Sequence, residues 1–90
     1  MGITYDPEKR TLILESRDLD FDDAVQIFAG TALTVEDDRK DYGETRYLTL
    51  GMLGERLVAV VWTPRREGRH IITMWKANER ERKRYEASLE

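Results

Sequence analysis

The sequence predicts an α+β fold: an antiparallel β-sheet meander with two N-terminal helices and a C-terminal helix. Apolar residues follow helical spacing in the first third of the chain. From residue 33 to residue 76 they alternate or run continuously, in segments separated by short turns. Short turns favour pairing between consecutive strands, and the helices then pack on the sheet. The 90 residues correspond to one domain, residues 1–90, with no repeat and no linker.

The N-terminal segment predicts a short strand followed by a helix. Ile3 to Tyr5 alternates and is rich in β-prone residues. Asp6 is a suitable N-cap and Pro7 suits the first helical position, so the helix is expected to begin there and to run to about Arg17.

A second helix is predicted between an Asp20 cap and a stop at Gly30. Its apolar residues have the spacing i, i+3, i+4 and i+7, which is typical of an amphipathic helix. We expect this stripe in the core: Phe21, Ala24, Val25 and Phe28.

Four further strands are predicted at residues 33–35, 46–52, 57–62 and 70–76. Gly54-Glu55 and residues 64–68 are the expected turns. Residues 57–62 are apolar at every position, which is typical of a strand buried on both faces, so this strand is expected at the centre of the sheet.

The last helix is predicted to begin after an Asn78 cap. Glu81 stands three residues later, as in a capping box. The helix is densely charged, and its basic residues are Arg80, Arg82, Lys83 and Arg84.

Composition excludes several classes of protein. The chain has no cysteine and a single histidine, His70, so neither a disulfide framework nor a structural zinc site is expected. No apolar run approaches the roughly 18 residues of a membrane span, and the N-terminus lacks the layout of a signal peptide. These features predict a cytoplasmic protein without a membrane partner.

Charge is distributed unevenly along the chain. Residues 1–45 hold 12 acidic and 5 basic residues, a net charge of -7, whereas residues 46–90 hold 6 acidic and 10 basic residues, a net charge of +4. The total is -3. A basic region on an acidic body indicates a polyanionic partner, most often a nucleic acid.

The residue types favour charge chemistry over metal or cofactor chemistry. RNA cleavage through the 2′-hydroxyl needs a group to take the hydroxyl proton, cations to stabilise the phosphorane and an acid for the leaving oxygen. Arginine suits the phosphate because its planar fork binds two oxygens. No metal and no cofactor is required. The alternative for each single residue is structural, since His70, Trp62, Trp75 and Tyr85 also suit packing or surface positions.

The sequence resembles the BrnT family, the toxin half of BrnT–BrnA type II toxin–antitoxin modules, which is related in fold to RelE-type ribonucleases. Collinear blocks carry the resemblance: YDPEKR at 5–10, LDFDDAVQIFAG at 19–30, DDRKDYGETR at 37–46, LTLGML at 48–53, ERLVAVVWTPR at 55–65 and IITMWKANERERKRY at 71–85.

The resemblance implies a RelE-like ribonuclease that cleaves RNA and inhibits translation. It also implies neutralisation by a BrnA-like antitoxin whose ribbon–helix–helix domain binds operator DNA, so that operator DNA is reached only through the antitoxin. The positions that the resemblance associates with catalysis are Arg46, Thr73, Lys76, Arg80, Glu81 and Tyr85. Resemblance and charge together assign RNA binding to Lys9, Arg65, His70, Trp75, Arg82, Lys83 and Arg84.

Three positions of the last strand depart from the family pattern. His70, Thr73 and Trp75 stand where Arg, Ser and Arg are usual, and Asp18 replaces a glycine before the second helix. Trp75 removes a charge, which leaves two alternatives open. One is a catalytically attenuated protein that binds its antitoxin and assists transcriptional repression. The other is a nucleic-acid-binding module without catalysis.

Overall fold

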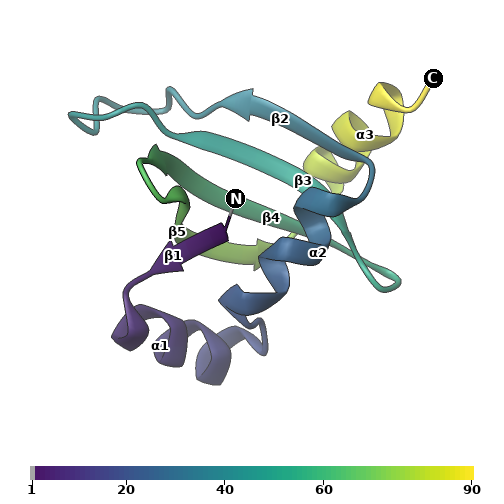
Figure 1. Ribbon diagram of the computed structural model, residues 1–90. Coiled ribbons are helices and arrows are strands. Elements are labelled where there is room, and N and C mark those ends of the chain that lie inside the picture. Colours follow the sequence, from purple (N-terminus) through teal and green to yellow (C-terminus); the bar gives the residue numbers. More distant parts are fainter. Residues whose placement is uncertain (1) are drawn as a thin grey trace.

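A computed structural model describes residues 2–90 and shows a five-stranded sheet with helices on both faces (Figure 1). The strands are β1 (Gly2–Tyr5), β2 (Ala32–Glu36), β3 (Tyr47–Leu53), β4 (Arg56–Arg65) and β5 (Gly68–Lys76). The helices are α1 (Pro7–Arg17), α2 (Ala24–Ala29) and α3 (Glu79–Ser88), and a single 3₁₀ turn, η1 (Phe21–Asp23), precedes α2. The α+β class predicted from the sequence is confirmed.

The sheet is mixed, with the strand order β1-β5-β4-β3-β2. Strands β2 to β5 pair as antiparallel neighbours, but β1 pairs in parallel with β5. The prediction of a purely antiparallel sheet is therefore wrong at this edge. Gly68 permits the parallel pairing, because its φ is 133° and a Cβ there would collide with the carbonyl oxygen of Gly2.

Helix α1 begins and ends as local chemistry requires. The carboxylate of Asp6 accepts a hydrogen bond from the Glu8 amide at 3.0 Å, as expected for an N-cap. At the other end Asp18 has φ 57°, a left-handed conformation that favours glycine and costs a residue with a Cβ roughly 1–2 kcal/mol. This conformation is the physical reason why a glycine suits position 18.

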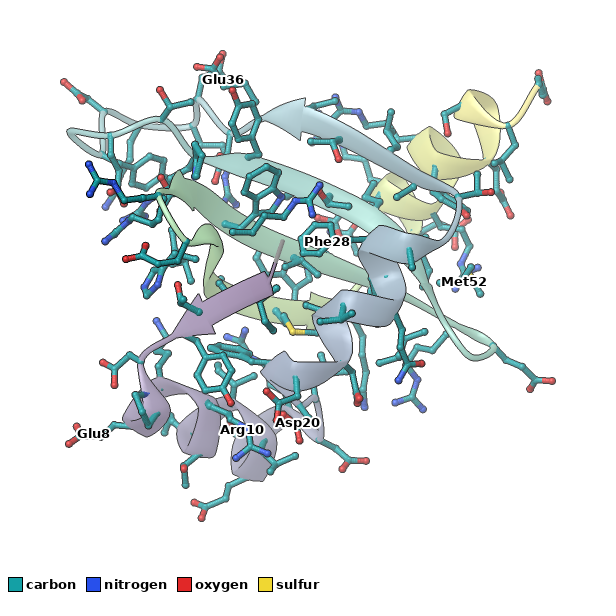
Figure 2. All side chains as sticks on the ribbon, viewed as in Figure 1. Glu8, Arg10, Asp20, Phe28, Glu36 and Met52 are labelled. Atoms are coloured by element: carbon teal, nitrogen blue, oxygen red, sulfur yellow. The ribbon has the colours of Figure 1, made fainter. Side chains whose placement is uncertain are left out.

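A carboxylate–guanidinium pair joins α1 to the turn before α2. Arg10 Nε and Nη2 each donate to one oxygen of Asp20 at 2.8 Å, and Figure 2 shows the two side chains facing each other. Asp20 also accepts from the Asp22 amide at 2.9 Å. The hydrogen bonds from Arg10 lower the pKa of Asp20 below its usual range.

The second helical segment differs from the regular helix that the sequence predicts. Its first residues, Phe21–Asp23, form a 3₁₀ turn, and the α-helix begins only at Ala24. The buried positions are Phe21 in the turn and Ala24 and Ile27 in the helix. Val25 is 53% exposed and Phe28 is half-buried. The prediction that Val25 belongs to the core is therefore wrong.

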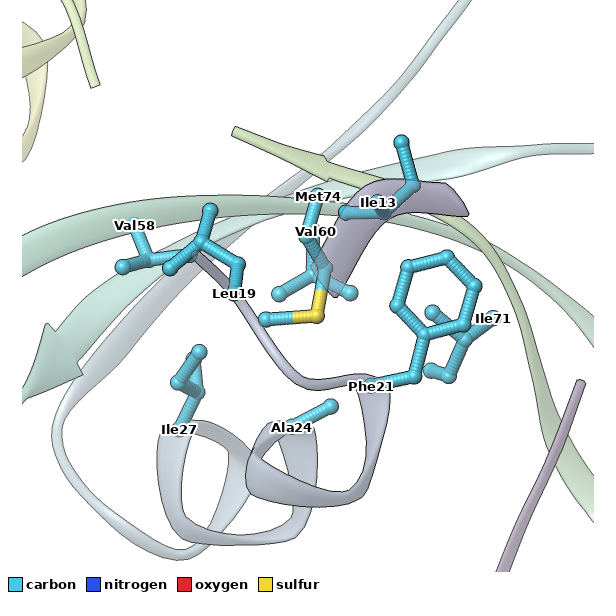
Figure 3. Packing of buried hydrophobic residues seen from close by; sticks show 9 residues of the cluster. All are labelled: Ile13, Leu19, Phe21, Ala24, Ile27, Val58, Val60, Ile71 and Met74. Atoms are coloured by element: carbon cyan, nitrogen blue, oxygen red, sulfur yellow. The ribbon is translucent and has the colours of Figure 1, made fainter. Parts of the chain in front are cut away.

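Two apolar clusters lie on opposite faces of the sheet. On the face that carries α1 and α2, which we call the α1/α2 face, the cluster consists of Ile13, Leu19, Phe21, Ala24, Ile27, Val58, Val60, Ile71 and Met74 (Figure 3). On the face that carries α3, which we call the α3 face, it consists of Leu50, Leu57, Ala59 and Tyr85. Strand β4 contributes to both clusters, which confirms it as the central strand. No helix within residues 2–90 has the length and apolarity that a bilayer crossing requires.

Phe21→Ala should lower the free energy of unfolding by about 3–5 kcal/mol, because the ring is fully buried between α2 and the sheet. Val25→Ala, on the same segment, should change it by only about 0.5 kcal/mol. Urea denaturation followed by far-UV circular dichroism measures both values. Equal losses of unfolding free energy in the two variants would contradict the finding that this segment buries Phe21 and exposes Val25.

Candidate functional site

A bulge in the sheet shapes the α3 face at β5. Thr73 pairs with Val61, but the next pair is Ile71 with Trp62, so Ile72 is an extra residue opposite β4. A β-bulge of this kind changes which face each following side chain occupies.

The bulge brings separated polar residues to one face. Ile71 and Met74 both pack in the cluster of the α1/α2 face, although they are three residues apart. Strict alternation would put His70 on the face of Met74. With the extra residue, His70 instead lies on the α3 face together with Thr73 and Trp75.

One end of the α3 face holds a small pocket lined by cations. Its volume is about 230 Å³. We call it the cationic pocket and define it by Lys9, Arg46, Arg65 and His70, which come from α1, the loop before β3, the end of β4 and β5. Asp6, Glu44, Ile71 and Ile72 complete its lining. Four residues predicted from the sequence therefore surround one pocket.

Glu44 holds the two arginines of this pocket. Arg46 Nε donates to Glu44 Oε2 at 3.1 Å, and Arg65 Nη2 lies 3.5 Å from Glu44 Oε1. The Arg46 guanidinium also stacks over the Tyr42 ring, 4.1 Å from its centroid. The Glu44 carboxylate thus bridges two cations, as a phosphate oxygen pair would.

His70 is oriented by the neighbouring strand. In the parallel pairing Thr4 is opposite His70, and Thr4 Oγ1 lies 2.8 Å from His70 Nδ1. This contact occupies one ring nitrogen, so Nε2 is the ring nitrogen that Thr4 leaves available for another partner. No pattern in the sequence pointed to Thr4, because its contact with His70 depends on the pairing of β1 with β5.

A second, larger pocket of about 450 Å³ lies at the other end of the α3 face, beside the start of α3. Its lining includes three arginines, Arg39, Arg80 and Arg84, with Leu48, Asn78 and Glu81. We call the three arginines the arginine cluster. Arg80 and Arg84 are among the residues predicted from the sequence, whereas Arg39 is not.

Glu81 is engaged in the structure. It accepts from the Asn78 amide at 2.9 Å, which completes the predicted capping box. It also accepts from Trp75 Nε1 at 3.1 Å and 3.2 Å. Trp75 packs beside the cluster of the α3 face, and the Arg39 guanidinium lies 5.6 Å from its ring centroid. Trp75 therefore links β5 to α3.

Arg39 is fixed by a buried carboxylate. Arg39 Nε and Nη2 donate to the two oxygens of Asp37 at 2.7 Å and 2.8 Å, and the Asp37 side chain is only 2% exposed. These hydrogen bonds lower the pKa of Asp37 and raise the pKa of Arg39. In the sequence both residues belong to a charged loop with no periodicity, so this role was not predictable.

Arg17 is a further residue that the sequence did not indicate. Its Nη1 donates to Thr73 Oγ1 at 3.1 Å and to the Met74 carbonyl at 2.8 Å. The end of α1 thereby meets β5 beyond the part that β1 covers. Thr73 is thus held by a cation between the two pockets.

The other residues predicted from the sequence lie elsewhere. Lys76 pairs with Val58 and shares the α1/α2 face with Met74. Arg82 lines a separate pocket with Asp18, Leu19, Leu53, Glu55 and Arg56, and Lys83 is exposed. Tyr85 is 7% exposed and donates to the Thr31 carbonyl at 3.0 Å, which gives it a packing role. Within residues 2–90 no group of three or more His, Cys, Asp or Glu side chains is placed to hold a metal ion.

A small α+β domain with clustered arginines and one oriented histidine on a sheet face has the features of a protein with an anionic partner. The family model of the ribonuclease toxin BrnT, of type II toxin–antitoxin systems, matches residues 5–81. The match covers most of the chain, and the protein therefore belongs to the BrnT family. No curated protein matches the sequence. A type II toxin has an antitoxin partner, and membership of a ribonuclease family supports an enzyme that acts on RNA.

Asp37→Asn should lower stability at neutral pH by about 1–2 kcal/mol, at the low end for charged hydrogen bonds because Arg39 is 61% exposed and screened by solvent. The pKa of Asp37 is lower in the folded state, so its stabilisation is present above the unfolded value near 3.9 and is lost as pH falls through the folded value. The difference in free energy of unfolding between the variant and the parent should therefore become smaller below about pH 4. Urea melts at several pH values measure it, with exposed Asp38→Asn as the control. A stability difference that does not depend on pH would contradict a stabilising ion pair between Asp37 and Arg39.

Proposed function

We propose that the protein is a metal-independent endoribonuclease toxin that cleaves messenger RNA in the cytoplasm and so inhibits translation. The observation that carries this proposal is the cationic pocket, where Lys9, Arg46 and Arg65 meet the single histidine. The RelE-like character implied by the resemblance is part of the same proposal.

The reaction is the attack of a ribose 2′-oxygen on the adjacent phosphorus. The O2′–P bond forms and the P–O5′ bond breaks, which gives a 2′,3′-cyclic phosphate and a 5′-hydroxyl. The 2′-hydroxyl proton goes to a base, and the 5′-oxygen receives a proton from an acid. Atoms balance without water or a metal, and the protein has to supply positive charge and two proton transfers.

The cationic pocket suits these tasks. Arg46 and Arg65 can bind the non-bridging phosphate oxygens with their planar forks, and Lys9 adds a third positive charge. We assign His70 to proton transfer through Nε2, because Thr4 holds its Nδ1. Glu44 keeps the two arginines in position before the phosphate arrives, since it bridges both of them.

The arginine cluster then binds the RNA backbone beyond the scissile phosphate. Arg39, Arg80 and Arg84 line a pocket on the same sheet face, and Thr73 and Trp75 lie on β5 between the two pockets. Each phosphate that these side chains neutralise adds to the salt dependence of binding.

We further propose that the antitoxin partner is BrnA-like and binds operator DNA through its own DNA-binding domain. An acidic or apolar segment of it laid over the cationic pocket would silence the toxin by excluding RNA. Charge complementarity supports this arrangement, because the residues that line the pocket include three cations of the lysine and arginine type.

One observation favours a second candidate, a catalytically attenuated protein that binds its antitoxin and assists repression. The Glu81 carboxylate is engaged by Trp75 and by the Asn78 amide, so it is not free to move a proton. In this candidate the RNA-binding face persists and the cleavage rate is low.

Arg46→Gln and Arg65→Gln should each slow single-turnover cleavage of an RNA oligonucleotide by about 10²–10³-fold, by analogy with the loss of one preorganised donor. The parent should keep its activity in EDTA. Arg56→Gln, an exposed cation at the start of β4, is the matched control and should cleave at the parent rate. A parent that is inactive in EDTA, or an equal loss in the control, would refute the assignment.

Trp75→Arg should speed single-turnover cleavage, because it restores the cation that family members commonly carry on the α3 face. The substitution also removes the bond to Glu81, so rates are compared at the same folded fraction, determined by thermal melting. Trp75→Phe is the control, since it keeps an aromatic ring and loses only the indole donor. Slower cleavage with weaker RNA binding would show instead that the indole stacks on a base.

A further inference from the structure

The α1/α2 face is not fully covered by its helices. Between α2 and β1 the structure has a groove of about 230 Å³, which we call the arginine groove; it is lined by Ile3, Val25, Phe28, Ala29 and Arg69. Figure 2 shows Phe28 reaching from α2 over the strands. Ile3 and Phe28 pack against the core of this face, so the groove is on the opposite side of the sheet from the cationic pocket.

Arg69 gives the groove a positive charge without a counter-ion. Its guanidinium carbon lies 4.1 Å from the centroid of the Phe28 ring and 5.0 Å from that of Trp62. Its Nε is buried and has no hydrogen-bond partner in the described part of the chain. The ion pairs found among residues 2–90 do not include Arg69. A buried donor without an acceptor is costly, and an incoming carboxylate would relieve that cost.

The surroundings of Arg69 are apolar and aromatic. Val25 is 53% exposed on the rim of the groove. Trp62 stacks on Tyr47 with ring centroids 4.9 Å apart and meets the Phe28 ring edge-on at 5.7 Å. Half-buried Trp, Tyr and Arg side chains beside an exposed aliphatic residue are the composition of protein–protein hot spots.

Charge distinguishes a protein partner from RNA at this groove. Arg69 is the only cation among its lining residues, whereas RNA binding depends on several phosphate contacts. The other lining residues are apolar, so a polyanion would find one cation here, whereas a single acidic side chain beside an apolar one matches this lining.

We propose that the arginine groove anchors the antitoxin through a segment in which an apolar side chain adjoins an aspartate or glutamate. The apolar side chain packs against Val25 and Phe28, and the carboxylate binds the guanidinium of Arg69. This inference rests on the antitoxin partner of the proposed function but not on the chemistry of the cationic pocket. An anchor on the α1/α2 face leaves the RNA-binding face to a separate inhibitory segment.

The test uses the full chain and the antitoxin produced from the reading frame adjacent to its gene, with affinity measured by isothermal titration calorimetry. Val25→Asp and Arg69→Gln should each weaken binding about tenfold or more, which is the effect of a hot-spot residue. The matched control is Leu12→Asp on α1, where the leucine is 58% exposed and outside the groove. It should bind within about twofold of the parent.

Cleavage of an RNA oligonucleotide separates this proposal from the proposed function. All three variants should cleave at the parent rate, because none of them alters the cationic pocket. Parent affinity for the antitoxin in both groove variants would overturn the proposal, as would a parent that does not bind the antitoxin. Loss of RNA binding in Val25→Asp would show that the groove serves RNA. A parent dimer that Val25→Asp dissociates, seen by light scattering, would show that a second copy of the chain is the occupant.

Should Arg69→Gln lower the melting temperature, Val25→Asp decides the outcome, because Val25 is exposed and its replacement leaves the core intact. Arg69→Lys then tests the geometry: it keeps the charge and loses the planar fork, so it should retain only part of the affinity.

Discussion

Burial of β4 on both faces is the constraint on which the rest of the structure depends. Five consecutive residues, Leu57 to Val61, are at most 2% exposed, so each face of the strand needs its own apolar cover. Helices α1 and α2 supply one cover and α3 the other, and β3 and β5 satisfy its backbone on either side. The bulge after Val61 keeps Ile71 and Met74 in one core cluster while it turns His70 to the opposite face. The packing around β4 thus decides on which face of the sheet the polar residues of β5 lie.

This architecture separates two kinds of surface. The α3 face is lined by arginines held by carboxylates, Arg46 and Arg65 by Glu44 and Arg39 by Asp37, so that its positive charge is held in fixed positions. The α1/α2 face holds the Arg69 guanidinium among aromatic rings, outside the ion pairs found in residues 2–90. A toxin must bind its substrate and its antitoxin, and surfaces on opposite sides of one sheet permit separate recognition of each.

Positions 18 and 75, where the sequence departs from the family pattern, affect different parts of the structure. Asp18 has a left-handed backbone conformation, with φ 57°. Its effect is therefore on the stability of the turn after α1. Trp75 affects the α3 face, because its indole joins Glu81 to β5 and lies near Arg39. The indole takes a structural place in the α3 cluster, and the arginine cluster beside it keeps the positive charge of this face. The altered residue therefore changes the chemistry at one point of an otherwise basic surface.

The sequence by itself determined the order of helical and extended segments, the caps at Asp6, Asp20 and Asn78, the central strand and the family, because these depend on local propensity and on the apolar pattern. Only the tertiary structure decided that β1 joins β5 in parallel, that Val25 is exposed and that Lys76 lies on the face opposite Trp75. It also decided that Arg39 joins Arg80 and Arg84, and that Glu44 bridges two arginines. These outcomes depend on strand register, on one bulge and on contacts between residues far apart in the chain, and none of these leaves a periodic signal in the sequence.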